Sequence, residues 1–322
     1  MINKYAYGFP KNGENEEYNA LIENFKFEQI NQSELFDGLW TIEDEIKKTY
    51  EQNVDSYPTN EMTLQDHVLD TSILLGRYTP NTLQEYYKLC YGKDKLETKK
   101  WFNTEQTYFV PDFTDFDEND LFYQTKFKIT GEHPYLLGPY TFLKLSTGIP
   151  KDKFRDFALR IAKIYQLVVD DFLQVHIDEP AFTGELDSKE MDIIKEMYDI
   201  MSKTRMNTKI NVFTYYENLE WMYDIFDLPV NGIGIDFVNS KDNYENVLKV
   251  GFPKDKILFA GLVDNTTTDK KDILIKYDKL NGFDGVGNVV VTNSKPLYHY
   301  DTKKAKEILE ELHNIKPMIL VR

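Results

Sequence analysis

The chain has 322 residues, a net charge of −16 and one cysteine, Cys90. So acidic a chain is not expected to bind nucleic acid or an anionic membrane, because its electrostatic field repels both. A single cysteine excludes an internal disulfide and a cysteine-rich zinc site, and it favours a reducing compartment. The sequence has no signal-peptide pattern and no apolar run of membrane-spanning length, so we expect a cytoplasmic protein.

The first third of the chain is mostly helical in pattern. One short apolar run, Tyr5–Phe9, comes first and is typical of a strand. We interpret the helical stretch that follows as an insertion at about 14–100 within a single barrel domain, 1–322, because no linker-like composition separates it. Its predicted helices cover Glu16–Phe27, Ser33–Gln52, Thr63–Leu75 and Asn81–Leu89.

The rest of the chain alternates strand and helix patterns. The seven further strands are expected at Thr107–Val110, Tyr135–Gly138, Leu173–Asp178, Ile210–Tyr215, Gly232–Phe237, Ile257–Gly261 and Asn288–Thr292. The helices are expected at Lys153–Asp170, Ser188–Lys203, Asn218–Phe226, Asn243–Val250, Asp269–Leu280 and Thr302–Asn314. Parallel strands need crossover helices, so eight strands in this rhythm predict an α/β fold of the (β/α)₈ TIM-barrel type. A doubly wound open sheet is the alternative.

Carboxylates stand where two of these strands end. Asp178 and Glu179 precede Pro180, which stops the strand, and Asp236 ends another strand. Barrel enzymes keep their chemistry at this end of the strands, so all three acids are candidate ligand-binding residues. Asp178 and Asp236 could equally be turn residues, and adjacent strand residues such as Asp178 and Glu179 point to opposite faces. On the same alternation His176 is interpreted as a satisfied buried histidine.

A second candidate cluster precedes the strand at Thr107–Val110. Lys100, Trp101 and Asn103 place a cation beside an indole and an amide, a combination that suits a flat heterocycle with an anionic tail. Trp101 as an ordinary core residue beside solvated lysines is the alternative. The five histidines show no metal-binding spacing, and we expect no metal site in this chain.

Seven short motifs resemble, in the correct order, the amino-terminal domain of cobalamin-independent methionine synthase. They are Gly8-Phe9-Pro10, Asp66-His67-Val68-Leu69, Lys100-Trp101-Phe102-Asn103-Thr104, Leu136-Leu137-Gly138-Pro139, Ile177-Asp178-Glu179-Pro180-Ala181, Thr214-Tyr215-Tyr216 and Ala260-Gly261-Leu262. The resemblance implies the first of two barrels, one that helps to bind the methyltetrahydrofolate polyglutamate. In this family the second barrel binds homocysteine and the catalytic zinc. We expect this chain to end where that barrel would begin.

Two departures from the family pattern affect the expected ligand. Beyond Lys11 the family has a basic stretch ending in Arg-Glu-Leu-Lys, and here Glu16-Glu17-Tyr18-Asn19 stands in its place. Glu17 matches, but two cations are lost, one of them at Asn19, which disfavours a polyglutamate tail. Lys100 corresponds to the tail-binding lysine of the family. Near the carboxyl end the family cysteine is missing, and Cys90 matches no zinc ligand.

The leading hypothesis is a barrel associated with methyl transfer from 5-methyltetrahydrofolate to homocysteine in methionine biosynthesis. Because the chain offers no zinc ligands, we expect zinc only from a separate partner barrel, and no self-sufficient methyltransferase. A non-catalytic folate-like or small-ligand binding module is the first alternative, and an unrelated acid–base barrel enzyme is the second. No catalytic residue is assigned. The predicted substrate-binding residues are Lys11, Glu17, Asn19, Lys100, Trp101, Asn103, Asp178, Glu179 and Asp236.

Overall fold

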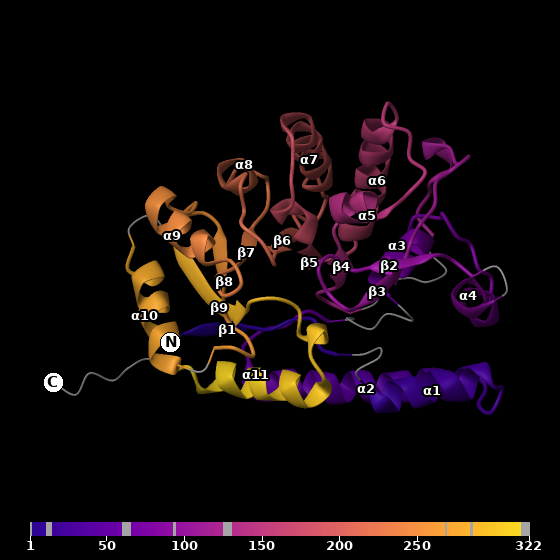
Figure 1. Ribbon diagram of the computed structural model, residues 1–322, viewed down its shortest axis with the longest axis horizontal. Coiled ribbons are helices and arrows are strands. Elements are labelled where there is room, and N and C mark those ends of the chain that lie inside the picture. Colours follow the sequence, from indigo (N-terminus) through magenta and orange to yellow (C-terminus); the bar gives the residue numbers. More distant parts are fainter. Residues whose placement is uncertain are drawn as a thin grey trace.

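The main element of the structure, a computed structural model, is a curled parallel sheet of seven strands with helices around it (Figure 1). The structure describes residues 2–10, 15–59, 66–92, 95–124, 131–267, 269–283 and 286–316. The strand order is β1-β9-β8-β7-β6-β5-β4. These strands are β1 (Asn3–Tyr5), β4 (Tyr135–Leu137), β5 (Gln174–Asp178), β6 (Lys209–Thr214), β7 (Gly232–Asp236), β8 (Ile257–Val263) and β9 (Asn288–Asn293).

A short extended segment closes the gap between the two edge strands. Ser56 forms a parallel bridge with Tyr5 of β1, and Thr59 forms one with Pro134 next to β4. The backbone N–H of Ser56 donates to Lys4 O at 3.2 Å, and that of Thr59 to His133 O at 2.6 Å. Pro58 has no N–H, so the segment is bridged at two points and not along a continuous ladder. The barrel fold predicted from the sequence is confirmed.

The second predicted barrel strand, Thr107–Val110, was wrong. The observed strand β3 (Thr107–Phe109) pairs antiparallel with β2 (Thr98–Lys100) and forms a hairpin separate from the main sheet. Tyr108 and Phe109 are both buried, and β3 lies against helix α3 (His67–Leu74), which explains why its sequence has the character of a core strand. The segment that lies between β1 and β4 in the barrel is instead Ser56–Thr59, which falls inside the predicted helical insertion.

The helices begin and end close to the predicted positions. The helix α2 starts with a capping box at Asn31 and α7 with one at Asp187, which satisfy the free amides of the first turn. Residues 63–65 of the third predicted helix lie outside the described residues. The helices are α1 (Glu16–Lys26), α2 (Gln32–Asn53), α3 (His67–Leu74), α4 (Leu83–Tyr91), α5 (Pro139–Leu145), α6 (Phe154–Val169), α7 (Ser188–Met201), α8 (Met222–Phe226), α9 (Lys241–Val250), α10 (Lys270–Asn281) and α11 (Thr302–Asn314).

Helix α5 was not predicted, since Gly138-Pro139-Tyr140 has the pattern of a tight turn. Three 3₁₀ turns complete the described elements, namely η1 (Glu118–Asp120), η3 (Pro180–Thr183) and η4 (Leu297–His299). The hairpin of α1 and α2 packs beside α11 along one side of the barrel (Figure 1). In the described part of the chain no helix combines the length and apolarity needed to cross a bilayer.

Aromatic rings fill the inside of the barrel. Tyr5, Tyr7, Tyr135, Phe213 and Phe259 form a buried cluster distinct from the larger core beneath the helices. Glycines of β7 face these rings, and a Cβ at Gly232 would lie 2.6 Å from Phe259 Cε2. Small residues on one strand therefore make room for large ones on its neighbours.

Candidate functional site

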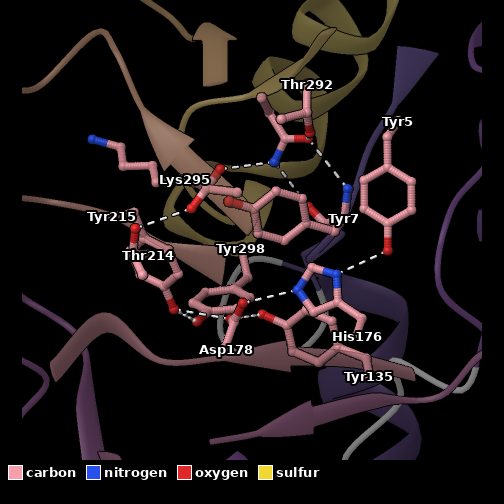
Figure 2. Close-up of polar contacts among 12 residues, drawn as sticks. Tyr5, Tyr7, Tyr135, His176, Asp178, Thr214, Tyr215, Thr292, Lys295 and Tyr298 are labelled. Atoms are coloured by element: carbon pink, nitrogen blue, oxygen red, sulfur yellow. Dashed lines mark hydrogen bonds and ion pairs between the residues drawn. The ribbon is translucent and has the colours of Figure 1, made fainter. Parts of the chain in front are cut away.

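Asp178 sits at the centre of a buried polar cluster inside the barrel (Figure 2). It shares the interior face of β5 with His176, whose Nε2 lies 2.9 Å from Asp178 Oδ1. The hydroxyl of Tyr215 donates to Asp178 Oδ2 at 2.9 Å, and the hydroxyl of Tyr135 donates to the same oxygen. We call Tyr5, Tyr135, His176, Asp178, Tyr215 and Tyr298 the Asp178 cluster. Its outer members are Tyr5, whose hydroxyl is 2.8 Å from His176 Nδ1, and Tyr298, whose hydroxyl is 3.3 Å from that of Tyr215.

Burial sets the protonation of this cluster. It raises the pKa of Asp178 to about 8, although the hydroxyls of Tyr135 and Tyr215 act to lower it. Burial also holds the pKa of His176 well below its ordinary value. Near neutral pH the imidazole is therefore neutral, and Asp178 can keep a proton to donate to His176 Nε2. Half-buried Tyr298 is the outermost hydroxyl of this chain of hydrogen bonds.

Glu179, the next residue, points the opposite way. Its carboxylate accepts hydrogen bonds from the backbone N–H groups of Tyr140 (3.1 Å) and Thr141 (2.7 Å) in the first turn of α5. The hydroxyls of Thr141 (2.6 Å) and Tyr198 (3.1 Å) also donate to it. Burial raises its pKa to about 7 against these four bonds. The free backbone amides in the first turn of α5 are thus used by Glu179.

Asp236 forms the turn that follows β7. Its carboxylate accepts from the backbone N–H groups of Val238 and Asn239, both at 2.9 Å, and from Asn239 Nδ2 at 2.8 Å. It also accepts the backbone N–H of Tyr216 at 3.3 Å. After burial, the charges of Asp178 and Asp236 are the largest causes that raise the pKa of Tyr7, so both acids lie near this one hydroxyl. The two carboxylates belong to the same region, but each has its own set of partners.

The β2–β3 hairpin is fixed to the barrel by the ring of Tyr216. The indole Nε1 of Trp101 donates to the Tyr216 hydroxyl at 2.8 Å, and this hydroxyl lies 2.7 Å from His299 Nε2. Burial lowers the pKa of His299 to about 3, so its imidazole is neutral near neutral pH. Tyr216 has φ of +89°, in the left-handed region that side chains other than glycine rarely adopt. We call Trp101, Phe102, Tyr216 and His299 the aromatic rim.

The sequence matches a known family over most of its length. The sequence model described as "Cobalamin-independent synthase, N-terminal domain" matches residues 3–286. This chain belongs to that family. The family resemblance seen in the seven motifs is therefore confirmed.

Curated relatives of this cobalamin-independent synthase domain are named 5-methyltetrahydropteroyltriglutamate–homocysteine methyltransferase. The protein from Thermotoga petrophila is 31% identical over an alignment of 323 positions, which covers 92% of this chain and 42% of the relative. The protein from Listeria monocytogenes serotype 4b is 31% identical over an alignment of 332 positions, which covers 93% of this chain and 43% of the relative. The chain thus spans less than half the length of these relatives.

Solved structures agree on the fold. A B12-independent methionine synthase from Shewanella sp. W3-18-1, determined in complex with selenomethionine, superposes with a TM-score of 0.66 at 13% identity, over 97% of this chain and 96% of that one. A putative vitamin-B12-independent methionine synthase from Listeria monocytogenes gives 0.62 at 11% identity, over 98% and 99%. At such identities the likeness concerns the fold alone.

The other predicted site residues of this synthase domain lie in two places. Lys100 and Asn103 are exposed on the hairpin, where Lys100 pairs with Glu105 at 2.8 Å and Asn103 Nδ2 donates to Glu217 at 3.2 Å. Glu17 and Asn19 lie at the start of α1, which packs on α2. The prediction for Lys11 falls outside the described residues. The tyrosines that surround Asp178 were not predicted as site residues. Tyr215 stands in one of the seven family motifs, and the signal for the others was their position at or near strand ends.

Zinc does not fit the residues that the structure describes. No group of three or more His, Cys, Asp or Glu side chains among them could hold a metal ion. The Cys90 thiol is buried in α4 and lies 3.6 Å from Tyr86 O, and burial raises its pKa far above the ordinary value. A thiol that stays protonated is a poor zinc ligand. No step of a reaction is therefore assigned to a metal in this part of the chain.

Proposed function

We propose that this chain supplies the folate-binding barrel of a cobalamin-independent methionine synthase, acting with a zinc-bearing barrel on 5-methyltetrahydropteroyltriglutamate and homocysteine. The observation that carries the proposal is the family match over residues 3–286, together with relatives whose name states this reaction. The proposed role is to bind and orient the methyl donor. A partner barrel would supply zinc, which activates a thiol as its thiolate.

The aromatic rim supports this role. The rings of Trp101 and Phe102 have centroids 5.2 Å apart, and that of Phe102 is 5.6 Å from Tyr216. Phe102, Tyr216 and His299 are half-buried, so they offer ring surface beside the strand ends. A flat pteridine is a ligand that such rings could stack against. The nearby Asp178 cluster and Asp236 provide polar atoms able to orient it.

Calorimetric titration of the purified chain tests the proposal. 5-Methyltetrahydrofolate with one and with three glutamates is added to the wild type and to Trp101→Ala. We expect binding by the wild type and a loss of roughly 10- to 100-fold in affinity for the variant, the usual range for a lost aromatic contact and its hydrogen bond. Absence of binding by the wild type would overturn the proposal.

An activity assay tests the division of labour. The chain is assayed for methyl transfer to homocysteine alone and with the separately produced zinc-bearing half of the Thermotoga petrophila relative. We expect activity only in the mixture, and none when that half lacks zinc. Methyl transfer by the purified chain alone would contradict the need for a partner barrel.

A further inference from the structure

Lys295 lies at the carboxyl end of the barrel, two residues after β9. Its backbone is held firmly, because Asn293 Nδ2 donates both to Lys295 O at 2.8 Å and to Tyr7 O at 3.1 Å. The following Pro296 packs on Gly8, where an added Cβ would lie 2.6 Å from Pro296 Cβ. Gly8 has φ of +76°, which only glycine adopts easily. The base of the lysine side chain is thus fixed between the first and last strands.

The ammonium group of Lys295 has no partner among the described residues. Its side chain is half-buried, and no carboxylate of the described chain lies within ion-pair distance. Figure 2 shows it extending away from the Asp178 cluster. By contrast, the half-buried lysines Lys195, Lys276 and Lys304 each form an ion pair with a carboxylate. A cation that lacks a counter-charge in the described chain can form charge-assisted hydrogen bonds to an anionic ligand.

The surroundings of Lys295 suit the anionic end of an aromatic ligand. Its Nζ lies 5.5 Å from the ring centroid of Tyr300, and its charge contributes, after burial, to the lowered pKa of His299. His299 is a member of the aromatic rim, so the free cation and the candidate stacking surface are neighbours. Lys100, by contrast, has a side chain that is 61% exposed and already binds Glu105.

We propose that Lys295 binds a carboxylate of the substrate at the mouth of the barrel. It would thus take the role of the tail-binding lysine, which the resemblance to the family assigns to Lys100. This rests on the proposed function. Two substrates of the proposed reaction carry a carboxylate, the glutamyl chain of the folate and homocysteine. Either one would give the ammonium group the counter-charge that it lacks in the described chain.

The test compares Lys295→Gln with Lys100→Gln and with Lys276→Gln. Lys276 is the matched control, because it also lies near a tyrosine ring (Tyr244, 5.9 Å) but on α10 and paired with Asp272. Each protein is titrated with 5-methyltetrahydrofolate mono- and triglutamate and with L-homocysteine. We expect Lys295→Gln to weaken binding of the folates roughly 10- to 100-fold, as for a lost charge-assisted hydrogen bond, and Lys295→Arg to restore most of it. The melting temperature of Lys295→Gln should equal that of the wild type.

Each outcome has a separate meaning. Weaker folate binding in Lys295→Gln assigns the glutamyl carboxylate to Lys295, and weaker homocysteine binding alone assigns the amino-acid carboxylate. Folate and homocysteine affinities unchanged in Lys295→Gln, with the wild type binding, overturn the inference and leave the proposed function standing. If the wild type does not bind the folates, the proposed function fails, and the role of Lys295 fails with it.

Discussion

Asp178 and Glu179 are adjacent in sequence but lie in different regions of the molecule. Asp178 faces the barrel interior, where its carboxyl group contacts an imidazole and two tyrosine hydroxyls. Glu179 faces the helices and accepts four hydrogen bonds, two of them from the free amides of α5. The two-residue period of a strand produces this division. Asp178 is therefore available to a ligand-binding site, whereas Glu179 has a structural role, which we call the frame of the barrel.

Asp178 and Glu179 both have a raised pKa, but the two shifts arise in different surroundings. Burial raises the pKa of Asp178 to about 8 and that of Glu179 to about 7. The partners of Glu179 include backbone amides that have no other acceptor in the first turn of a helix. The partners of Asp178 are side chains, which can reorient when a ligand arrives. A raised pKa alone thus does not distinguish a site residue from a structural one.

The largest expected effect comes from Glu179→Ala. It leaves four buried donors without an acceptor, and we expect the free energy of unfolding to fall by about 3–5 kcal/mol. Urea unfolding measures the loss, and Glu185→Ala, an exposed neighbour, should change it by less than about 0.5 kcal/mol. Equal effects of the two variants would contradict the structural role of Glu179. Folded Glu179→Ala should retain the affinity for ligand.

Asp178→Asn should change how stability depends on pH. The raised pKa means that the folded state binds more protons than the unfolded state between about pH 4 and pH 8. The contribution of Asp178 to the free energy of unfolding of the wild type therefore falls as pH rises through this window. Asp178→Asn removes this contribution, so between pH 5 and pH 8.5 the free energy of unfolding of the variant should fall less, or rise more, than that of the wild type, as measured by urea unfolding at both values. An unchanged slope would mean that Asp178 does not titrate there, and exposed Asp152→Asn is the control for the lost charge.

The barrel could be predicted from the sequence because most of its strands are buried apolar runs ending in turn residues. The exception is instructive. Thr107–Phe109 has the composition of a wall strand but pairs in a hairpin, whereas the segment at Ser56 and Thr59 closes the wall with Pro58 between them. The residue types of a segment indicate whether it is buried, but they do not indicate which strand it pairs with.

The site could be predicted only in part for a related reason. The opposite directions of Asp178 and Glu179 follow from strand geometry and were predicted. The partners of Asp178 were not, because Tyr135 and Tyr215 are 43 and 37 residues away in the chain and reach it only through the curvature of the sheet. Similarly, Trp101 finds Tyr216 across 115 residues. Contacts of this kind need the register of the strands, which the pattern of one sequence does not contain.

The smallest global effect is expected from Tyr216→Phe, which tests whether the hairpin belongs to the site or to the frame. The variant leaves Trp101 Nε1 and His299 Nε2 without their shared partner and should lower the free energy of unfolding by about 1–2 kcal/mol. The hairpin is also held by Gln106 Nε2, which donates to Tyr298 O at 2.5 Å, so it should open locally more often without detaching. Hydrogen exchange of residues 98–109 should accelerate, while exchange in β5 and β6 changes little.

Tyr223→Phe, at a ring that is 64% exposed on α8, is the control. If exchange in β5 accelerates as much as in the hairpin, the aromatic rim and the Asp178 cluster form one cooperative unit, and the distinction between site and frame lies at Glu179 alone.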